Sequence, residues 1–250
     1  YSAEDIGTQC HKYGAKSVTF SYRTKPMGFD WPQSFAEVPL LTHVVGKTAH
    51  FKDGTSKEVD AIILCTGYRH HFPFLPDELT LATRNRLYPE GLYKGIVSLA
   101  NPKLMFLGMQ DQYYTFNMFD AQTWYARDIM LGRIKLPAEQ AMASDSREWV
   151  AREEQVADPF EAIDYQAAYI LDLLEPTDYP PFDVLAVADI FKEWEHHKAA
   201  DILGYRNKSY RSTLTGTMAP VHHTPWMDAM DDSLEAFLHD KQSKPATAST

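Results

Sequence analysis

The sequence lacks a basic cluster and has few cysteines. Its 250 residues include 34 acidic and 24 basic side chains, which give a net charge of −10. Such a charge argues against nucleic acid as a partner, because binding to phosphates requires a basic surface. The two cysteines, Cys10 and Cys65, are distant in sequence and have apolar neighbours. This pattern predicts reduced, buried thiols in a cytoplasmic protein.

Long hydrophobic runs and glycine-rich loops are also missing. No run approaches the roughly 18 apolar residues of a membrane span, so we expect a soluble protein without a membrane partner. No Gly-x-Gly pair occurs, and the chain opens without Met on Tyr1, in what resembles the first turn of a helix. We therefore expect a fragment whose phosphate-binding loops lie upstream of Tyr1.

Motifs for metal binding and hydrolysis are missing as well. The paired histidines are adjacent residues, which point about 100° apart on a helix, whereas zinc ligands are spaced three or four residues apart. The pairs are His70 and His71, His196 and His197, and His222 and His223. The sequence contains neither Cys-x-x-Cys nor the Gly-x-Ser-x-Gly of a hydrolase. We therefore expect no metal site.

The first 25 residues have the pattern of half a nucleotide-binding unit. Residues 2–13 have helical spacing, and residues 17–22 have the β-branched and aromatic content of a strand. Arg23, Thr24 and Lys25 follow that strand, about 20 residues after the start of the helix. In dinucleotide-binding βαβ units an Arg near this place accommodates an adenosine 2′-phosphate. A solvated turn with two cations is the alternative.

Two apolar runs predict strands buried in a parallel sheet. Residues 60–68, which end in Thr66 and Gly67, follow a proline-broken connection at 27–39 and a hairpin that turns at Asp53 and Gly54. Ligands in such sheets bind beyond the carboxyl ends of the strands. A plain core strand ending in a glycine turn is the alternative. Residues 104–109 predict the second buried strand.

The rest of the chain predicts a polar loop followed by helices. The loop begins at Gln110 and passes into a helix that ends near Gly132; further helices are expected at 138–155, 161–174, 187–203 and 225–238. Amides and acids packed among aromatics after a buried strand are typical of a site for a planar cofactor. Each large aromatic is a core candidate, but as a group they could form a cavity that selects alkylated amines. These aromatics are Tyr113, Tyr114, Trp124, Trp194 and Trp226.

Several strings of residues resemble the flavin-containing monooxygenases, in particular the bacterial members that act on trimethylamine. The likeness covers nearly the whole chain. Its strings are Cys65-Thr66-Gly67-Tyr68, Gln110-Asp111-Gln112-Tyr113, Trp194-Glu195-His196-His197-Lys198, and residues 218–226.

The resemblance implies an α/β flavoprotein with two Rossmann-like domains for FAD and NADPH, here without the N-terminal FAD-binding half. Residues 1–70 would complete the NADPH-binding domain. Residues 71–240 would form the C-terminal part of the FAD-binding domain with a helical extension, and residues 241–250 a flexible tail.

The resemblance also implies an activity. The complete protein would oxidise trimethylamine or similar small tertiary amines to N-oxides, with NADPH and O2, through a C4a-hydroperoxyflavin. Family members are commonly homodimers, and this chain alone is expected to be inactive. An S-oxygenase or broad sulfide and indole oxidiser on the same scaffold, and a non-catalytic nucleotide-binding fragment, are the alternatives.

Residue roles follow from the same resemblance. The cofactor-binding candidates are Ser2, Arg23, Thr24, Lys25, Thr66, Gly67, Gln110 and Gln112, with Arg23 on the 2′-phosphate of NADPH. The catalytic-site candidates are Tyr1, Asp111, Tyr113 and Trp194. The trimethylamine enzymes are expected to carry Trp where this chain has Tyr113, so the substrate range stays open.

Overall fold

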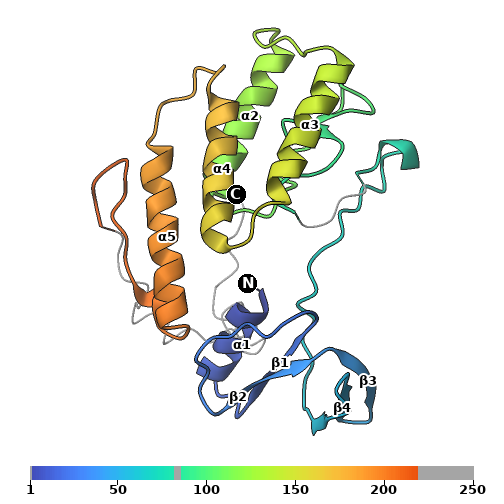
Figure 1. Cartoon of the computed structure of the whole chain (residues 1–250), viewed down its shortest axis with the longest axis vertical. Coiled ribbons are helices and arrows are strands. Elements are labelled where there is room, and N and C mark those ends of the chain that lie inside the picture. The colour runs from blue at the N-terminus through green and yellow to red at the C-terminus, as the bar shows by residue number, and fades with distance from the viewer. Residues whose placement is uncertain (1, 82–85, 219–250) are drawn as a thin grey trace, which may run out of the picture. The chain divides into compact units, whose positions relative to one another are not determined.

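The computed structural model describes residues 2–81 and 86–218 (Figure 1). The chain divides into a large unit, Tyr1–Tyr205, and a second unit, Arg206–Thr250. The candidates Tyr1 and Trp226, the pair His222 and His223, the helix predicted at 225–238 and the tail at 241–250 lie outside the described residues.

The large unit begins with the predicted helix and strand. Helix α1 spans Ser2–Lys12, and strand β1, Val18–Tyr22, pairs in parallel with β2, Phe35–Pro39. Gly7 allows the helix to lie against the strand, because a Cβ there would stand 2.4 Å from Cε1 of Phe20. Strand β2 corrects the expectation of an irregular segment at 27–39. Pro39 is compatible with it as the last residue of the strand, where a missing N–H interrupts no ladder.

The predicted hairpin is confirmed. Strands β3, Leu41–Val45, β4, Thr48–Phe51, and β5, Ser56–Glu58, form an antiparallel sheet in that order. The turn between β4 and β5 contains Asp53, whose carboxylate accepts from the N–H of Thr55 at 3.0 Å and from its hydroxyl at 2.7 Å.

The strand predicted at 60–68 is wrong. This segment has no regular secondary structure and is unpaired, with Ile63 55% and Leu64 77% exposed. Apolar content alone does not make a strand, because the backbone needs a neighbour for its hydrogen bonds. No strand of the described residues pairs with this segment.

The second buried strand is also corrected. Strands β6, Leu92–Tyr93, and β7, Val97–Ser98, form a short hairpin after the 3-10 helix η1, Asp77–Leu79. From residues 104–109, only Met105 bridges to Val97. The pairing stops because the N–H of Gly108 donates to the side chain of Gln122 at 2.8 Å instead of to a neighbouring strand.

Four helices carry the core and confirm the helical prediction for this part of the chain. They are α2, Phe116–Met130, α3, Glu139–Glu153, α4, Pro159–Leu174, and α5, Val184–Ala200. They run side by side (Figure 1), and α4 contacts the other three. The start of α5 is earlier than predicted because the Asp183 carboxylate accepts the N–H of Ala186 at 2.9 Å, which caps the helix.

The second unit is described to residue 218. The 3-10 helix η2, Tyr205–Asn207, leads into it, and Arg211 bridges to Met218. Both cysteines are free as predicted, but they are partly exposed, not buried: Cys10 lies on α1 and Cys65 in the unpaired segment. In the part of the chain that the structure describes, no helix is long and apolar enough to cross a membrane.

Candidate functional site

The loop that begins at Gln110 is held between the segment at Arg86, before β6, and α2. The N–H of Asp111 donates to the carbonyl oxygen of Arg86 at 2.7 Å, and Gln110 is buried. Asp111, Gln112 and Tyr113 are partly buried. The loop therefore presents polar side chains that are neither fully in the core nor fully in water.

A buried network fixes the start of this loop. The side chain of Gln122, on α2, has no exposed surface; its Nε2 donates to Oε1 of Gln110 at 2.8 Å and to the hydroxyl of Tyr169 at 3.0 Å. The hydroxyl of Tyr169 donates to the carbonyl oxygen of Lys94 at 2.7 Å. Burial raises the pKa of Tyr169, so its hydroxyl remains protonated and can serve as this donor.

The hairpin turn at Lys94 and Gly95 packs directly onto the network. Gly95 has φ +62°, and a Cβ there would lie 2.5 Å from Nε2 of Gln110 and 2.7 Å from the hydroxyl oxygen of Tyr169. The ammonium of Lys94 donates to Asp145 on α3 at 2.8 Å and to Asp172 on α4 at 2.7 Å. Burial alone would lower the pKa of Lys94, but these carboxylates outweigh it and raise the pKa.

Helix α4 holds the middle of the loop through Gln166, which is completely buried. Its Oε1 accepts the N–H of Tyr113 at 2.8 Å, and its Nε2 donates to the carbonyl oxygen of Asp111 at 2.7 Å. One side chain thus binds the backbone on both sides of Gln112.

Helix α5 meets the end of the loop. The hydroxyl of Tyr113 donates to Oε1 of the buried Glu195 at 3.0 Å, and the Tyr113 ring lies edge-on to Phe191 with centroids 5.8 Å apart. Trp194 is the neighbour of Glu195 on this helix; its ring contacts Tyr205 at 5.2 Å. The structure therefore brings Tyr113, at the end of the loop, to the helix that carries Trp194.

A buried ion pair joins α1 to the same helix. Glu4 on α1 pairs with Lys198 on α5, and both side chains are buried. The hydroxyl of Tyr205 donates to Asp5 at 3.1 Å. Ser2, at the exposed start of α1, is thereby on a helix that contacts α5.

The other predicted cofactor residues lie apart from this loop. Arg23, Thr24 and Lys25 follow β1 and are exposed, and their side chains make no hydrogen bond or ion pair with the described residues. Thr66 and Gly67 lie in the unpaired segment and are also exposed. Contacts among the described residues do not connect either group with the Gln110 loop.

Two observations bear on whether a flavin and a nicotinamide nucleotide fit. Oε1 of Gln112 is buried and has no hydrogen-bond partner among the described residues, so an N–H donor of a bound ring would satisfy it. Arg23 and Lys25 are exposed cations without carboxylate partners in the described chain, so both are available to bind a phosphate. These two features are compatible with a ring N–H at Gln112 and a phosphate at Arg23 and Lys25; the Gly-x-Gly loops for the pyrophosphates are not in this sequence.

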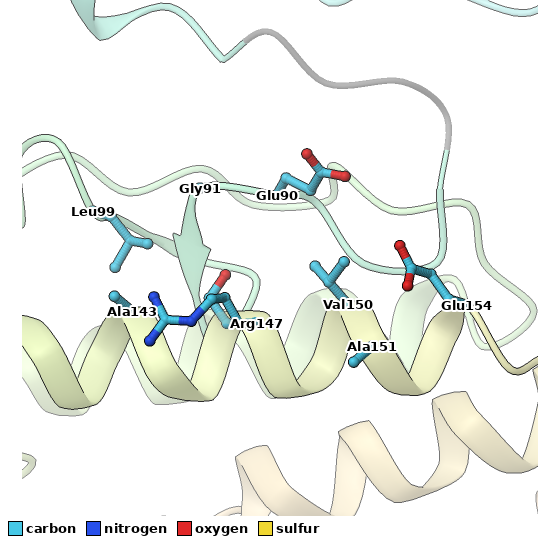
Figure 2. Close-up of a pocket in the computed structure, with 9 residues that line it drawn as sticks. Glu90, Gly91, Leu99, Ala143, Arg147, Val150, Ala151 and Glu154 are labelled. Atoms are coloured by element: carbon cyan, nitrogen blue, oxygen red, sulfur yellow. The ribbon is translucent and has the colours of Figure 1, made fainter.

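A groove of about 410 Å³ lies elsewhere, along α3 (Figure 2). Leu99 and Val150 line it together with the charged side chains of Glu90, Arg147 and Glu154. None of the predicted site residues lines this groove. In the described ranges, no group of His, Cys, Asp and Glu side chains could hold a metal ion.

Sequence reasoning missed the residues that support the loop. Gln122 and Gln166 each occupy a helix position whose neighbours at helical spacing are mostly buried and apolar, such as Ile163 and Ile170 around Gln166. Glu195 differs, because Lys192 and Lys198 flank it at helical spacing. A polar residue on the apolar stripe of a helix was the available signal, because burying it is unfavourable without a partner.

Comparisons with known proteins agree on one family. The family described as flavin-binding monooxygenase-like matches residues 37–178. A trimethylamine monooxygenase from Methylocella silvestris is 60% identical over 248 residues, which are 99% of this chain and 54% of the relative. The crystal structure of Tmm from a Pelagibacter species is 55% identical, with a TM-score of 0.86 over 95% of this chain and 54% of that one. An S-allyl-L-cysteine S-oxygenase from Allium sativum has the same fold at 23% identity, with a TM-score of 0.64 over 83% of this chain and 49% of that one.

Proposed function

Because the chain belongs to the flavin-binding monooxygenase-like family, we propose that the protein containing it oxidises trimethylamine or similar small tertiary amines to N-oxides. The observation that carries the proposal is the 60% identity with a trimethylamine monooxygenase over 99% of the chain. The chain spans about half the length of the curated relatives it matches. The proposed activity is therefore that of the complete protein, as a homodimer that uses FAD, NADPH and O2.

The domain arrangement is part of the proposal. Residues 1–70 would complete an NADPH-binding domain, and residues 71–240 would complete an FAD-binding domain, with residues 241–250 as a tail. The unpaired segment at 60–68 supports this arrangement, since it has the apolar side chains of a buried strand but exposes them. The half of the relatives that this chain does not span would supply the neighbouring strands.

The bound flavin would activate oxygen after reduction by NADPH, and this chain would supply binding, orientation and exclusion of water. Arg23, helped by Thr24 and Lys25, would bind the 2′-phosphate, with Ser2 and Tyr1 toward the nicotinamide end. Gln112 would offer its unpartnered oxygen to a ring N–H.

The amine would lie against the aromatic side chains at the end of the loop. Tyr113 and Trp194 would wall the pocket, with Asp111 beside them, while Thr66, Gly67 and Gln110 would lie near the flavin. A dry pocket suits this chemistry, because water that reaches activated oxygen diverts it to hydrogen peroxide.

The proposal is tested by assaying the complete purified protein for NADPH oxidation and N-oxide formation. We expect a yellow protein that turns over trimethylamine faster than a thioether or indole. Faster turnover of the thioether would favour the S-oxygenase alternative. A colourless protein that oxidises no NADPH with added flavin would refute the proposal.

Replacement of Arg23 tests the nucleotide site. Arg23→Ala should raise the KM for NADPH at least tenfold and leave that for NADH nearly unchanged, because only NADPH carries the phosphate. Lys52→Ala removes another exposed cation, in the turn after β4, and serves as the control. Equal losses for the two nucleotides would remove Arg23 from this role.

A further inference from the structure

We propose that Gln166 is a positioning residue for the amine pocket: it holds the backbone of Asp111–Tyr113 so that Gln112 and Tyr113 face the substrate and cofactor in one arrangement. The inference rests on the proposed function and deepens it. No contact between Gln166 and substrate is required, because the side chain acts through the loop.

The two hydrogen bonds of Gln166 reproduce those of a neighbouring strand. Its carboxamide accepts from the N–H of Tyr113 at 2.8 Å and donates to the carbonyl oxygen of Asp111 at 2.7 Å. The backbone N–H can only donate and the carbonyl can only accept, so these partners determine which end of the amide is which. A carboxamide is the side chain that offers both groups in one plane.

The buried position of Gln166 supports this positioning role. It lies on the buried face of α4 between Ile163 and Ile170, where an apolar residue would ordinarily pack. Burial of an amide is unfavourable unless both of its polar ends are paired. Here both ends are used on the loop, and the apolar core around them excludes competing water.

The position of the loop backbone matters because the loop carries Gln112 and Tyr113. Gln112, between the two held backbone groups, has the unpartnered buried oxygen. Tyr113, directly after it, extends its ring to α5 and donates to Glu195 at 3.0 Å. If the backbone at Asp111 or Tyr113 shifts, both side chains move relative to the pocket.

Three variants of the complete enzyme separate positioning from simple stability. Gln166→Leu removes both hydrogen bonds and replaces the amide with an apolar side chain of similar size. Gln166→Met keeps the length of the side chain and removes both hydrogen-bonding groups, and it provides a test if the Leu variant does not fold. Gln140→Leu changes an exposed glutamine on α3 and is the matched control.

We expect both Gln166 variants to raise the KM for trimethylamine about tenfold, with the KM for NADPH within twofold of the parent, because two hydrogen bonds hold the loop. More of the NADPH consumed should yield hydrogen peroxide, and Gln140→Leu should match the parent. A lower melting temperature with both KM values unchanged would make Gln166 merely structural and overturn the proposal.

A second readout separates this inference from the proposed function. Hydrogen exchange at the amide of Tyr113 should be faster in Gln166→Leu than in the parent and in Gln140→Leu. If the parent turns over no amine, the proposed function fails. Hydrogen exchange at the amide of Tyr113 still tests whether Gln166 holds the loop. Unchanged exchange at Tyr113 would overturn the inference whatever the activity.

Discussion

Gly95→Ala is the substitution that most directly tests the packing beneath the candidate site. Gly95 has φ +62°, and the added methyl group would lie 2.5 Å from Nε2 of Gln110 and 2.7 Å from the hydroxyl oxygen of Tyr169. Gln122 donates to the hydroxyl of Tyr169 and to Oε1 of Gln110, so neither side chain can move aside without straining these hydrogen bonds.

Two costs add in this variant. A left-handed backbone conformation costs an Ala about 1–2 kcal/mol relative to Gly. Insertion of a methyl group into a close-packed interior costs about 1–3 kcal/mol more. We therefore expect Gly95→Ala to lower the free energy of unfolding by about 2–5 kcal/mol.

Gly91→Ala is the matched control. Gly91 has φ +79°, but a Cβ there meets no atom within 4 Å, so only the backbone cost of about 1–2 kcal/mol applies. Urea unfolding is followed by tryptophan fluorescence, to which Trp149 contributes from its place against Tyr88 and Tyr169 in this core. Equal destabilisation by the two substitutions would refute the proposed close packing at Gly95.

Two further predictions concern charged contacts. Lys94→Met should lower the free energy of unfolding by about 1–3 kcal/mol at pH 7, because it leaves the carboxylate of Asp172 without its partner. Since the folded state raises the pKa of Lys94, the difference in stability from the parent should persist below about pH 10 and shrink as the pH rises through the folded pKa. Thermal unfolding of both proteins across this pH range measures the difference. Tyr113→Phe should lower the free energy of unfolding by about 1–2 kcal/mol, because it removes the hydrogen bond to the buried Glu195. The hydroxyl of Tyr179 contacts an exposed carboxylate at 3.3 Å, so Tyr179→Phe should lower it by less than about 0.5 kcal/mol. Similar losses for the two variants in chemical denaturation would contradict the assigned burial of Glu195.

Local patterns predicted the parts of the fold that local forces control. The helices at 138–155 and 161–174 have apolar residues at helical spacing, and they form within two residues of those bounds as α3 and α4. The hairpin at Asp53 follows from a turn residue whose carboxylate accepts the N–H and the hydroxyl of Thr55. These features depend on residues a few positions apart, so the sequence contains what determines them.

Local patterns wrongly predicted strands at 60–68 and 104–109. Their apolar runs are those of buried strands, yet a strand exists only where another segment pairs with it. For residues 60–68 no described strand does so, and for 104–109 the side chain of Gln122 takes the N–H of Gly108. Pairing is a property of distant segments, which a local pattern does not include.

For the candidate site, the sequence by itself determined which residue types are available: the loop at Gln110–Tyr113, the Trp194 helix and the cations after β1. Only the tertiary structure decided that Gln166 and Glu195, 53 and 82 residues away from Tyr113 along the chain, bind that loop. The reason is physical. A buried polar side chain is stable only where folding brings it a partner, and the identity of that partner is set by the packing of α4 and α5 around the loop.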